Sequence, residues 1–316
     1  MNTLVTGGAG FIGSNFIRYI LKHHKEDRVV NLDVLTYAGN LHNLDGVTDN
    51  TNYHFVQGNI RNRELVRHLV AEYQIDTIVN FAAESHVDRS IKAPDAFVET
   101  NVEGTLALLD VAKEARLSKF IQISTDEVYG ALGKAGTFTE ESPLQPNSPY
   151  SASKASADML ARAYFKTYGL DVSITRSSNN YGPRQHPEKL IPRMITRALS
   201  GETLPIYGNG KNVRDWLYVM DNCRAIDLVM RHGRAGEVYN IGGHNERSNN
   251  EIVRLFCSKL GISEDRIKYV ADRLGHDWRY AVDSSKIERE LGWQSQQEFL
   301  MGMEQTIQWY VAQYRS

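Results

Sequence analysis

Short apolar runs alternate with segments of helical periodicity through the first half of the chain. The apolar runs are typical of buried strands, which we predict at residues 3–6, 29–32, 53–56, 77–81 and 120–124. Helical spacing of apolar residues predicts helices at 11–24, 63–73, 95–115 and 151–168. This alternation predicts an α/β fold with a Rossmann-type, doubly wound parallel sheet that helices cover on both faces. Such a sheet binds its ligand at the carboxyl ends of its strands.

The pattern loosens after about residue 170, where loops rich in Asn, Gly and Pro separate shorter elements. We therefore predict two domains, a dinucleotide-binding domain over residues 1–175 and a smaller mixed α/β domain for the substrate over residues 176–316. Some segments of the second part are expected to return to the first domain. The sequence contains no internal repeat and no low-complexity linker that would mark the boundary.

Composition narrows the classes of partner. The chain has 316 residues, 41% hydrophobic and 23% charged, with a formal net charge of −2. No overall basic field would recruit nucleic acid or an anionic membrane, so local Arg, Lys and helix ends must bind any anionic ligand. No apolar run reaches membrane-spanning length and no signal-peptide pattern opens the chain, so we expect a cytoplasmic protein. Cys223 and Cys257 lack metal-ligand spacing, which predicts two reduced, buried thiols and no metal site.

A glycine-rich turn follows the first predicted strand and leads directly into the first predicted helix. Gly8, Gly10 and Gly13 have the GxGxxG spacing, and Gly7, Gly10 and Gly13 the related GxxGxxG spacing. Such glycines let the backbone approach a pyrophosphate at a helix N-terminus, although a structural glycine turn is the alternative. Asp33 lies after the second strand, where a carboxylate binds the adenosine ribose. An acidic residue there favours NAD over NADP, because it would repel a 2′-phosphate.

Tyr150 and Lys154 are spaced i, i+4 at the start of a predicted helix, which places both side chains on one face. A lysine ammonium beside a phenol lowers the pKa of the phenol, so the pair can act as a base toward a sugar hydroxyl. The spacing alone is weak evidence, because Tyr207 and Lys211 share it. Two intervening glycines make a helix improbable for that second copy.

A hydroxyl and two carboxyl side chains, those of Thr125, Asp126 and Glu127, directly follow the strand predicted at 120–124. An Asp-Glu pair in a loop is usually a solvated turn. Here the pair lies at the carboxyl end of a sheet strand, where the cofactor is expected, and this position favours acid and base roles in catalysis.

These motifs together resemble the dTDP-glucose 4,6-dehydratase family, which belongs to the extended short-chain dehydrogenases/reductases. The resemblance covers essentially the whole chain. It rests on TGGAGFIGS (6–14), DVLTYAGNLHNL (33–44), FAAESHVDRSI (81–91), STDEVYG (124–130), YSASK (150–154), NNYGPRQHPEKLIP (179–192) and VRDWLYVMD (213–221). The Thr-Asp-Glu triplet is the most discriminating of these, since related epimerases usually lack the acid pair.

The resemblance implies a lyase that acts on dTDP-glucose with NAD. Tyr150 would remove the C4 hydroxyl proton, tuned by Lys154 and assisted by Thr125, as hydride passes from C4 to NAD. Glu127 would remove the C5 proton while Asp126 protonates the departing C6 hydroxyl. Return of the hydride to C6 gives a 4-keto-6-deoxy sugar, an intermediate of deoxysugar (for example rhamnose) biosynthesis. The cofactor stays bound throughout.

The resemblance also implies binding residues and a homodimer. Besides Tyr150 and Lys154, the cofactor contacts would be Gly7, Gly10, Phe11, Ile12, Gly13, Asp33, Asn59, Ile60 and Ala82. The contacts to the sugar and the nucleotide would be Ser85, His86, Asn179, Lys189, Leu190, Arg214, Asn249, Arg273 and His276.

Four features depart from the family pattern. Asn59 replaces an Asp that contacts adenine, and Leu274 replaces a Pro beside Arg273. Residues 131–136 form a short segment, and Arg247-Ser248 is atypical before Asn249. These departures lie in segments expected to bind the nucleotide more than in those expected to carry out the reaction.

Three alternative functions remain open. A C4 epimerase or a dehydratase for another nucleotide sugar would share the scaffold, but epimerisation needs no acid at C6. An inactive NAD-sensing or scaffold protein would have lost the five catalytic side chains, which are all present. An oxidoreductase with net redox change would exchange free NAD and NADH.

Overall fold

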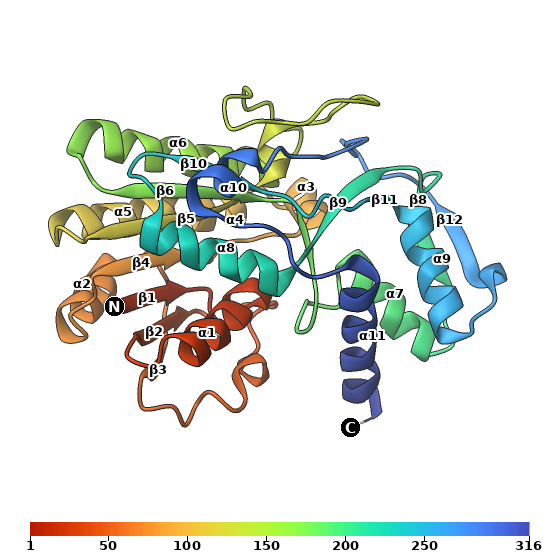
Figure 1. Ribbon diagram of the computed structural model, residues 1–316, viewed down its shortest axis with the longest axis horizontal. Coiled ribbons are helices and arrows are strands. Elements are labelled where there is room, and N and C mark those ends of the chain that lie inside the picture. Colours follow the sequence, from red (N-terminus) through yellow and green to blue (C-terminus); the bar gives the residue numbers. More distant parts are fainter. Residues whose placement is uncertain (316) are drawn as a thin grey trace.

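The computed structural model describes residues 1–315, and a seven-stranded parallel sheet forms its centre (Figure 1). The strands lie in the order β10-β6-β5-β4-β1-β2-β3. Their bounds are β1 (Asn2–Thr6), β2 (Arg28–Asp33), β3 (Tyr53–Gln57), β4 (Thr77–Asn80), β5 (Lys119–Thr125), β6 (Val172–Ser177) and β10 (Val238–Ile241). The first five match the predicted strands to within a residue or so at each end, and the predicted Rossmann-type fold is confirmed.

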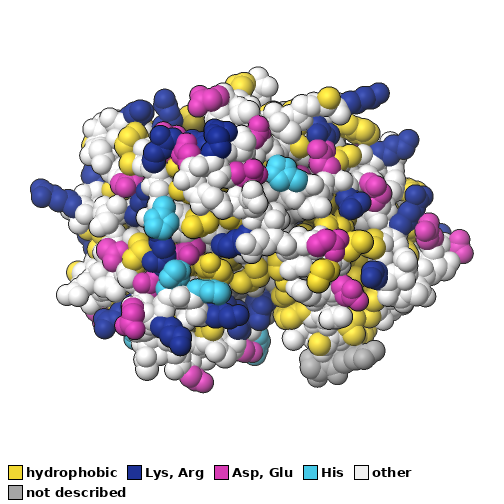
Figure 2. Space-filling model, in the orientation of Figure 1, with side chains coloured by type: hydrophobic (Ala, Val, Ile, Leu, Met, Phe, Trp, Pro, Cys, Tyr) yellow, Lys and Arg dark blue, Asp and Glu magenta, His cyan; other side chains and the backbone are white. Residues whose placement is uncertain are grey.

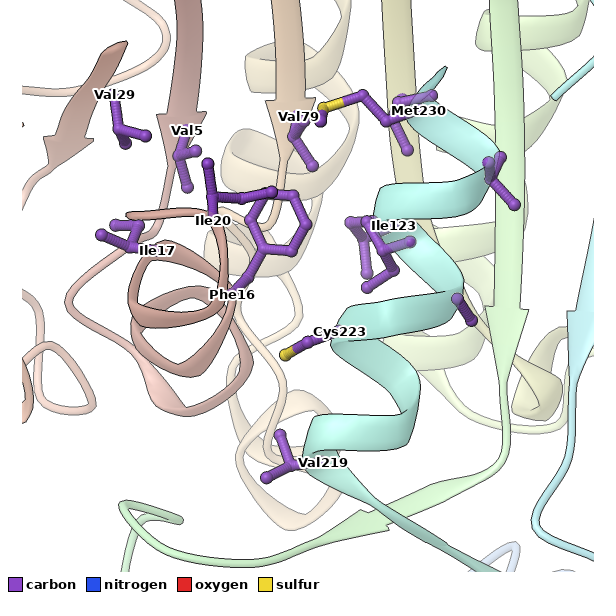
Figure 3. Close-up of a cluster of buried hydrophobic side chains, with 14 of the residues drawn as sticks. Val5, Phe16, Ile17, Ile20, Val29, Val79, Ile123, Val219, Cys223 and Met230 are labelled. Atoms are coloured by element: carbon purple, nitrogen blue, oxygen red, sulfur yellow. The ribbon is translucent and has the colours of Figure 1, made fainter. Parts of the chain in front are cut away.

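Helices cover both faces of this sheet. One face carries α1 (Phe11–His23) and α8 (Val219–His232), and the other carries α2 (Arg63–Glu72), α5 (Thr105–Glu114) and α6 (Pro149–Tyr168). Adjacent strand residues point to opposite faces. Val5 and Val79 therefore pack against α1 and α8 (Figure 3), while Leu4 and Ile78 belong to the opposite cluster.

The helix predicted at 95–115 is interrupted, which corrects the sequence-based expectation of one regular helix. It consists of α4 (Asp95–Phe97), a π-helical turn η2 (Val98–Gly104) and α5. The π-helical turn contains buried Asn101, whose amide bonds the backbone of Glu84 (2.8 and 3.0 Å) and Ser153 Oγ (2.8 Å). A π-helical insertion therefore lies where this polar side chain enters the core, as is frequent near functional sites.

The second half of the chain builds smaller sheets beside the first one. One contains β7 (Asn179–Tyr181), β9 (Val213–Tyr218) and β11 (Glu246–Ser248), and another β8 (Leu204–Tyr207) and β12 (Ile267–Val270). The helices α7 (Leu190–Leu199), α9 (Asn249–Leu260) and α11 (Phe299–Arg315) accompany them in Figure 1. Short elements complete the fold: α3 (Val87–Lys92), α10 (Ser285–Leu291), η1 (Leu41–Leu44), η3 (Asp126–Tyr129) and η4 (Glu264–Arg266).

Segments of the second half return to the large sheet. Strand β10 pairs with β6, and α8 packs against α1 on the sheet face shown in Figure 3. The proposed boundary near residue 175 falls within β6, a fully buried strand of the large sheet, and the division into two domains stays a prediction.

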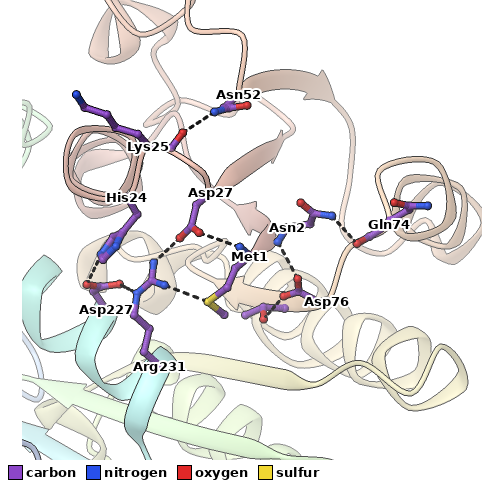
Figure 4. A network of polar contacts seen from close by, with 11 residues as sticks. Met1, Asn2, His24, Lys25, Asp27, Asn52, Gln74, Asp76, Asp227 and Arg231 are labelled. Atoms are coloured by element: carbon purple, nitrogen blue, oxygen red, sulfur yellow. Dashed lines mark hydrogen bonds and ion pairs between the residues drawn. The ribbon is translucent and has the colours of Figure 1, made fainter.

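A polar network joins α8 to the beginning of the chain (Figure 4). Arg231 forms ion pairs with Asp27 and with Asp227, the second at 2.7 Å between Nε and Oδ1. Asp27 also accepts a hydrogen bond from the amino group of Met1 (2.8 Å), and His24 lies 2.8 Å from Asp227. These contacts fix the end of α8 against β1 and α1.

Basic and acidic side chains are interspersed over the face shown in Figure 2. Cys223 and Cys257 are both buried and free, as predicted. Among residues 1–315, no helix combines the length and apolar character that crossing a bilayer requires.

Candidate active site

Two cavities meet beyond the carboxyl ends of the large sheet's strands. The first has a volume of about 370 Å³ and contains the glycine turn after β1, the end of β5 and the start of α6. The second has a volume of about 170 Å³ and lies between segments of the second half of the chain and residues 86–88 of the first half. Glu127, Asn179 and Lys189 line both cavities. A molecule in the second cavity can therefore reach the first one at these residues.

The glycine turn forms one wall of the first cavity and leaves no room for side chains. A Cβ atom on Gly7 would lie 2.7 Å from the backbone of Ala82, and one on Gly13 would lie 2.5 Å from the carbonyl oxygen of Gly7. No described side chain caps α1 at Gly10, so amide groups of its first turn are left for a ligand. This cradle fits the pyrophosphate of a dinucleotide.

Asp33 lies at the end of β2 and is 7% exposed. Its carboxylate accepts hydrogen bonds from the backbone of Ala9 (2.9 Å) and Leu35 (2.8 Å), while burial raises its pKa. The first cavity brings together all the residues that the sequence proposed for the cofactor: Gly7, Gly10, Phe11, Ile12, Gly13, Asp33, Asn59, Ile60, Ala82, Tyr150 and Lys154.

Local sequence explains how α6 presents its side chains. Ser148 caps the helix, with its hydroxyl accepting a hydrogen bond from the amide of Ser151 (3.1 Å), and Pro149 occupies the first turn. Tyr150 and Lys154 therefore lie one turn apart beside the end of β5, and both are buried. The segment Tyr207–Lys211 is a strand end and a turn, as expected.

The two carboxyl groups after β5 have different surroundings. Burial raises the pKa of Asp126 well above its usual range, and the carboxylates of Glu127 and Asp215 raise it further. The pKa of Glu127 is also raised by burial, although Lys189, Arg214 and Arg273 reduce this rise. Asp126 is thus set to stay protonated, while Glu127 faces cations that stabilise its anion. Neighbouring carboxyls with separated pKa values suit an acid and a base.

The contacts of Lys154 differ from the expected tuning of Tyr150. Its Nζ donates a hydrogen bond to the carbonyl oxygen of Ile123 (2.6 Å), and burial lowers its pKa to about 8. Burial raises the pKa of Tyr150, and Glu127 and Asp126 add to this rise, whereas a hydrogen bond with Thr125 lowers it. Burial and the two carboxyls are thus the main causes of the raised pKa of Tyr150.

Residues proposed for the substrate line the cavities as a group. Ser85 lines the first cavity, and Asn179 and Lys189 line both. The side chains that line the second cavity include those of His86, Asn179, Lys189, Leu190, Arg214, Asn249, Arg273 and His276.

The two arginines of the second cavity are held differently. Arg214 donates to the backbone oxygens of Val213 (2.8 Å) and Asp277 (3.0 Å), and it lies over the ring of Tyr280. Arg273 instead pairs with Asp88, at 2.6 Å between Nε and Oδ1. Both guanidinium groups are therefore oriented by the protein itself.

Three of the four departures from the family pattern lie at the cavities or next to a residue that lines them. Asn59 still lines the first cavity. Leu274 is 75% exposed, and its neighbour Arg273 still lines the second cavity. Arg247 lies over the ring of Phe299, while Ser248 caps α9 and thereby places Asn249 in its first turn.

Sequence reasoning missed several residues around the site. Glu84 is buried and lines the first cavity beside Ser85, and burial raises its pKa. Its place in the FAAESHVDRSI motif was the available signal. Buried Asp158, one turn after Lys154, pairs with Arg176 at 2.9 Å, and no local pattern indicated that partner.

Known proteins match the chain along nearly its whole length. The sequence model of the family described as GDP-mannose 4,6 dehydratase matches residues 4–306. The low-salt glycan biosynthesis protein Agl12 of Haloferax volcanii is 57% identical over 311 residues, covering 98% of this chain and 99% of that protein. A dTDP-glucose 4,6-dehydratase of Xanthomonas campestris is 52% identical over 326 residues, covering 98% of this chain and 92% of its own length.

A solved structure agrees with these relatives. The crystal structure of a dTDP-glucose 4,6-dehydratase from Streptomyces venezuelae, with NAD bound, is 52% identical and has a TM-score of 0.97. The match covers 99% of this chain and 97% of that one. The resemblance seen in the sequence motifs is confirmed. The chain therefore belongs to the GDP-mannose 4,6 dehydratase family and is similar, over nearly its full length, to dTDP-glucose 4,6-dehydratases.

Proposed function

We propose that this protein is an NAD-dependent dTDP-glucose 4,6-dehydratase, a hydro-lyase that forms dTDP-4-keto-6-deoxyglucose and water. One observation carries the proposal: Asp126 and Glu127 lie side by side at the first cavity, one set to remain protonated and the other surrounded by cations. The relatives named as dTDP-glucose 4,6-dehydratases support the choice of substrate.

The chemistry divides among five side chains. Tyr150 takes the proton of the C4 hydroxyl in its phenolate form, which the hydrogen bond with Thr125 favours against the effect of burial. NAD, when bound, accepts a hydride and later returns it. The ketone at C4 acidifies the C5 proton, which Glu127 removes while Asp126 protonates the departing C6 hydroxyl. Lys154 adds a buried ammonium beside the end of β5.

The nucleotide would occupy the second cavity. Lys189, Arg214 and Arg273 line this cavity together with Glu127. Guanidinium groups bind phosphate oxygens in a bidentate manner, and their position suits the diphosphate of a dTDP-sugar. His276 and Asn249 line the same cavity and would contact the nucleotide there.

Two further properties are proposed together with this function, the oligomeric state and the cellular location. We expect a homodimer through the outer side of α6, because Met159 on α6 and Val98 on the adjacent η2 are 46% and 49% exposed. Two free thiols suit a reducing compartment, so we also place the enzyme in the cytoplasm.

The function is tested with dTDP-glucose carrying deuterium at C4, mixed with unlabelled substrate that carries a carbon label. We expect loss of one water molecule by mass spectrometry and deuterium on the C6 methyl of the same sugar molecule. UDP-glucose and GDP-mannose serve as competing substrates. Epimerisation without mass loss, crossover of deuterium between sugars, or a stoichiometric build-up of free NADH would contradict the proposal.

A second prediction concerns the cofactor. The unaltered protein should bind NAD far better than NADP, because the Asp33 carboxylate repels a 2′-phosphate. Asp33→Asn removes the charge and keeps an acceptor oxygen for only one of the Ala9 and Leu35 amides. It should therefore bind NAD about tenfold more weakly and narrow the difference in affinity between NAD and NADP. Calorimetric titration measures both affinities. Equal affinity of the unaltered protein for the two cofactors rejects the assignment.

A further inference from the structure

The side chain of Tyr37 connects the loop after β2 with two other parts of the chain. Its hydroxyl donates a hydrogen bond to Glu188 Oε1 (3.2 Å). The guanidinium of Arg89, on α3, lies 3.7 Å above the centre of its ring. The ring of His186 meets it edge-on at 5.5 Å. One aromatic side chain is thus held by three partners from outside its own loop.

These contacts bridge two walls of the first cavity. Thr36 and Ala38, the neighbours of Tyr37 in the chain, line that cavity on the side of β2. His186 and Glu188 line it from the segment after β7. Two walls of one cavity are therefore joined through Tyr37, outside the glycine turn that would hold the pyrophosphate.

The segment after β7 is itself firmly attached. Lys189 Nζ donates to the backbone oxygen of Ser85 (2.7 Å). Farther back, Arg184 donates to the backbone oxygen of Asn43 (3.1 Å), and Asn15 donates to that of Pro183 (3.0 Å). The segment after β7 is therefore fixed at both ends, and the cavity opens here only if the loop carrying Tyr37 separates from it.

Charges around Tyr37 favour the closed arrangement. Burial raises the pKa of its hydroxyl, and the carboxylates of Glu188 and Glu84 raise it further, so the hydroxyl keeps its proton and donates. His86 and His186 lie 3.7 and 3.8 Å from the other oxygen of Glu188, which is largely buried. The carboxylate is thus oriented toward Tyr37 by its own neighbours.

We propose that Tyr37, together with Glu188 and Arg89, forms a latch that retains the dinucleotide in its cavity throughout the catalytic cycle. This inference rests on the proposed function, because a reaction that returns its hydride to the same sugar needs a retained cofactor. Release of NAD requires the loop after β2 to separate from Glu188 on the segment after β7 and from Arg89 on α3. That separation breaks a hydrogen bond to a carboxylate and a cation–π contact. Tyr37 is a positioning residue and takes no part in the chemistry.

The test measures the release of NAD in the absence of any sugar. Protein loaded with NAD is diluted, and free NAD is assayed over time after rapid ultrafiltration. Tyr37→Phe loses the hydroxyl but keeps the ring, and NAD release should be about tenfold faster. Tyr37→Ala also loses the ring contacts, and release should be about 100-fold faster. Tyr314→Ala removes a tyrosine that is 53% exposed on α11 and should release NAD at the unaltered rate.

A double-mutant cycle separates the latch from general loosening of the fold. Arg89→Ala should speed NAD release by itself, but it should add little in the Tyr37→Ala background, because the two side chains act on one contact. The latch is overturned if the effects of Arg89→Ala and Tyr37→Ala on the rate of NAD release are fully additive, or if neither tyrosine variant changes that rate. If Tyr37→Ala does not fold, the rate of NAD release from Tyr37→Phe alone tests the latch. The release assay contains no sugar, so its result does not depend on the proposed function. Faster release of NAD from the Tyr37 variants would support the latch even if the unaltered protein did not dehydrate dTDP-glucose, and that second result would reject the proposed function.

Discussion

Asp126→Asn should oxidise dTDP-glucose at C4 but eliminate water about 10²–10⁴-fold more slowly, because the departing C6 hydroxyl loses its proton donor. The change is nearly isosteric, and the amide oxygen can keep the hydrogen bond from Thr125 Oγ1 (3.2 Å). The reduced cofactor should therefore accumulate on the enzyme, where its absorbance can be followed in a single turnover. Normal turnover of this variant would exclude the elimination role.

The matched control is Glu140→Gln. Glu140 is also a carboxyl whose pKa burial raises, but it accepts a hydrogen bond from the amide of Asn240 (2.9 Å) and lines neither described cavity. Its rate of elimination should stay within a few-fold of normal. Glu127→Gln should differ from both variants by suppressing exchange of the C5 proton with solvent deuterium.

The same assignment fixes the sign of the pH dependence. In the proposed mechanism Asp126 acts in its protonated form, and burial is the main cause that raises its pKa. Elimination should therefore slow as the pH rises through the raised pKa of Asp126, since the acid form is lost there.

Asp158→Asn should lower the free energy of unfolding by about 3–5 kcal/mol, because it leaves a buried guanidinium without its counter-charge. Asp158 and Arg176 are 0% and 3% exposed, and their side chains meet at 2.9 Å. Ser124 Oγ donates to the same carboxylate oxygen (3.0 Å). The midpoint of urea denaturation measures the effect, and an unchanged slope would show that stability alone has altered.

Two further variants test whether the loss of stability comes from the buried ion pair. Arg176→Met in the Asp158→Asn background should recover much of the lost stability, since an apolar side chain tolerates burial without a partner. Glu114→Gln breaks the exposed pair with Arg67 and should leave the midpoint nearly unchanged. A small effect of Asp158→Asn would mean that the buried pair contributes little.

Local sequence patterns were sufficient to predict the first five strands and to propose side chains that line the first cavity. The glycine turn, the carboxyl pair and the Tyr150–Lys154 spacing all lie within short segments, where one strand end or one helical turn fixes the geometry. The electrostatic difference between Asp126 and Glu127 needed the structure, because Asp215, Lys189 and Arg214 come from distant segments.

Strand β6 shows why the second half was harder to predict. Every residue from Val172 to Ser177 is buried, yet the sequence VSITRS has no continuous apolar run. Its polar side chains are satisfied by distant partners: Ser173 Oγ donates to the backbone oxygen of Arg234, and Arg176 pairs with Asp158. Strand β10 is similar, because buried Asn240 accepts a hydrogen bond from Tyr129 (2.8 Å). Hydrophobic periodicity cannot identify strands whose burial depends on such partners.

The late return of α8 and β10 to the large sheet affects how the chain folds during synthesis. A ribosome completes β1 to β5 and α1 long before it reaches residues 219–241. Until then the nascent sheet lacks an edge strand, and part of the apolar face around Val79 and Ile123 lacks its covering helix. An uncovered apolar face of this kind is prone to aggregation and is a typical substrate of chaperones. The Arg231 network can form only when α8 is complete, so the first half of the fold gains these contacts only late in synthesis.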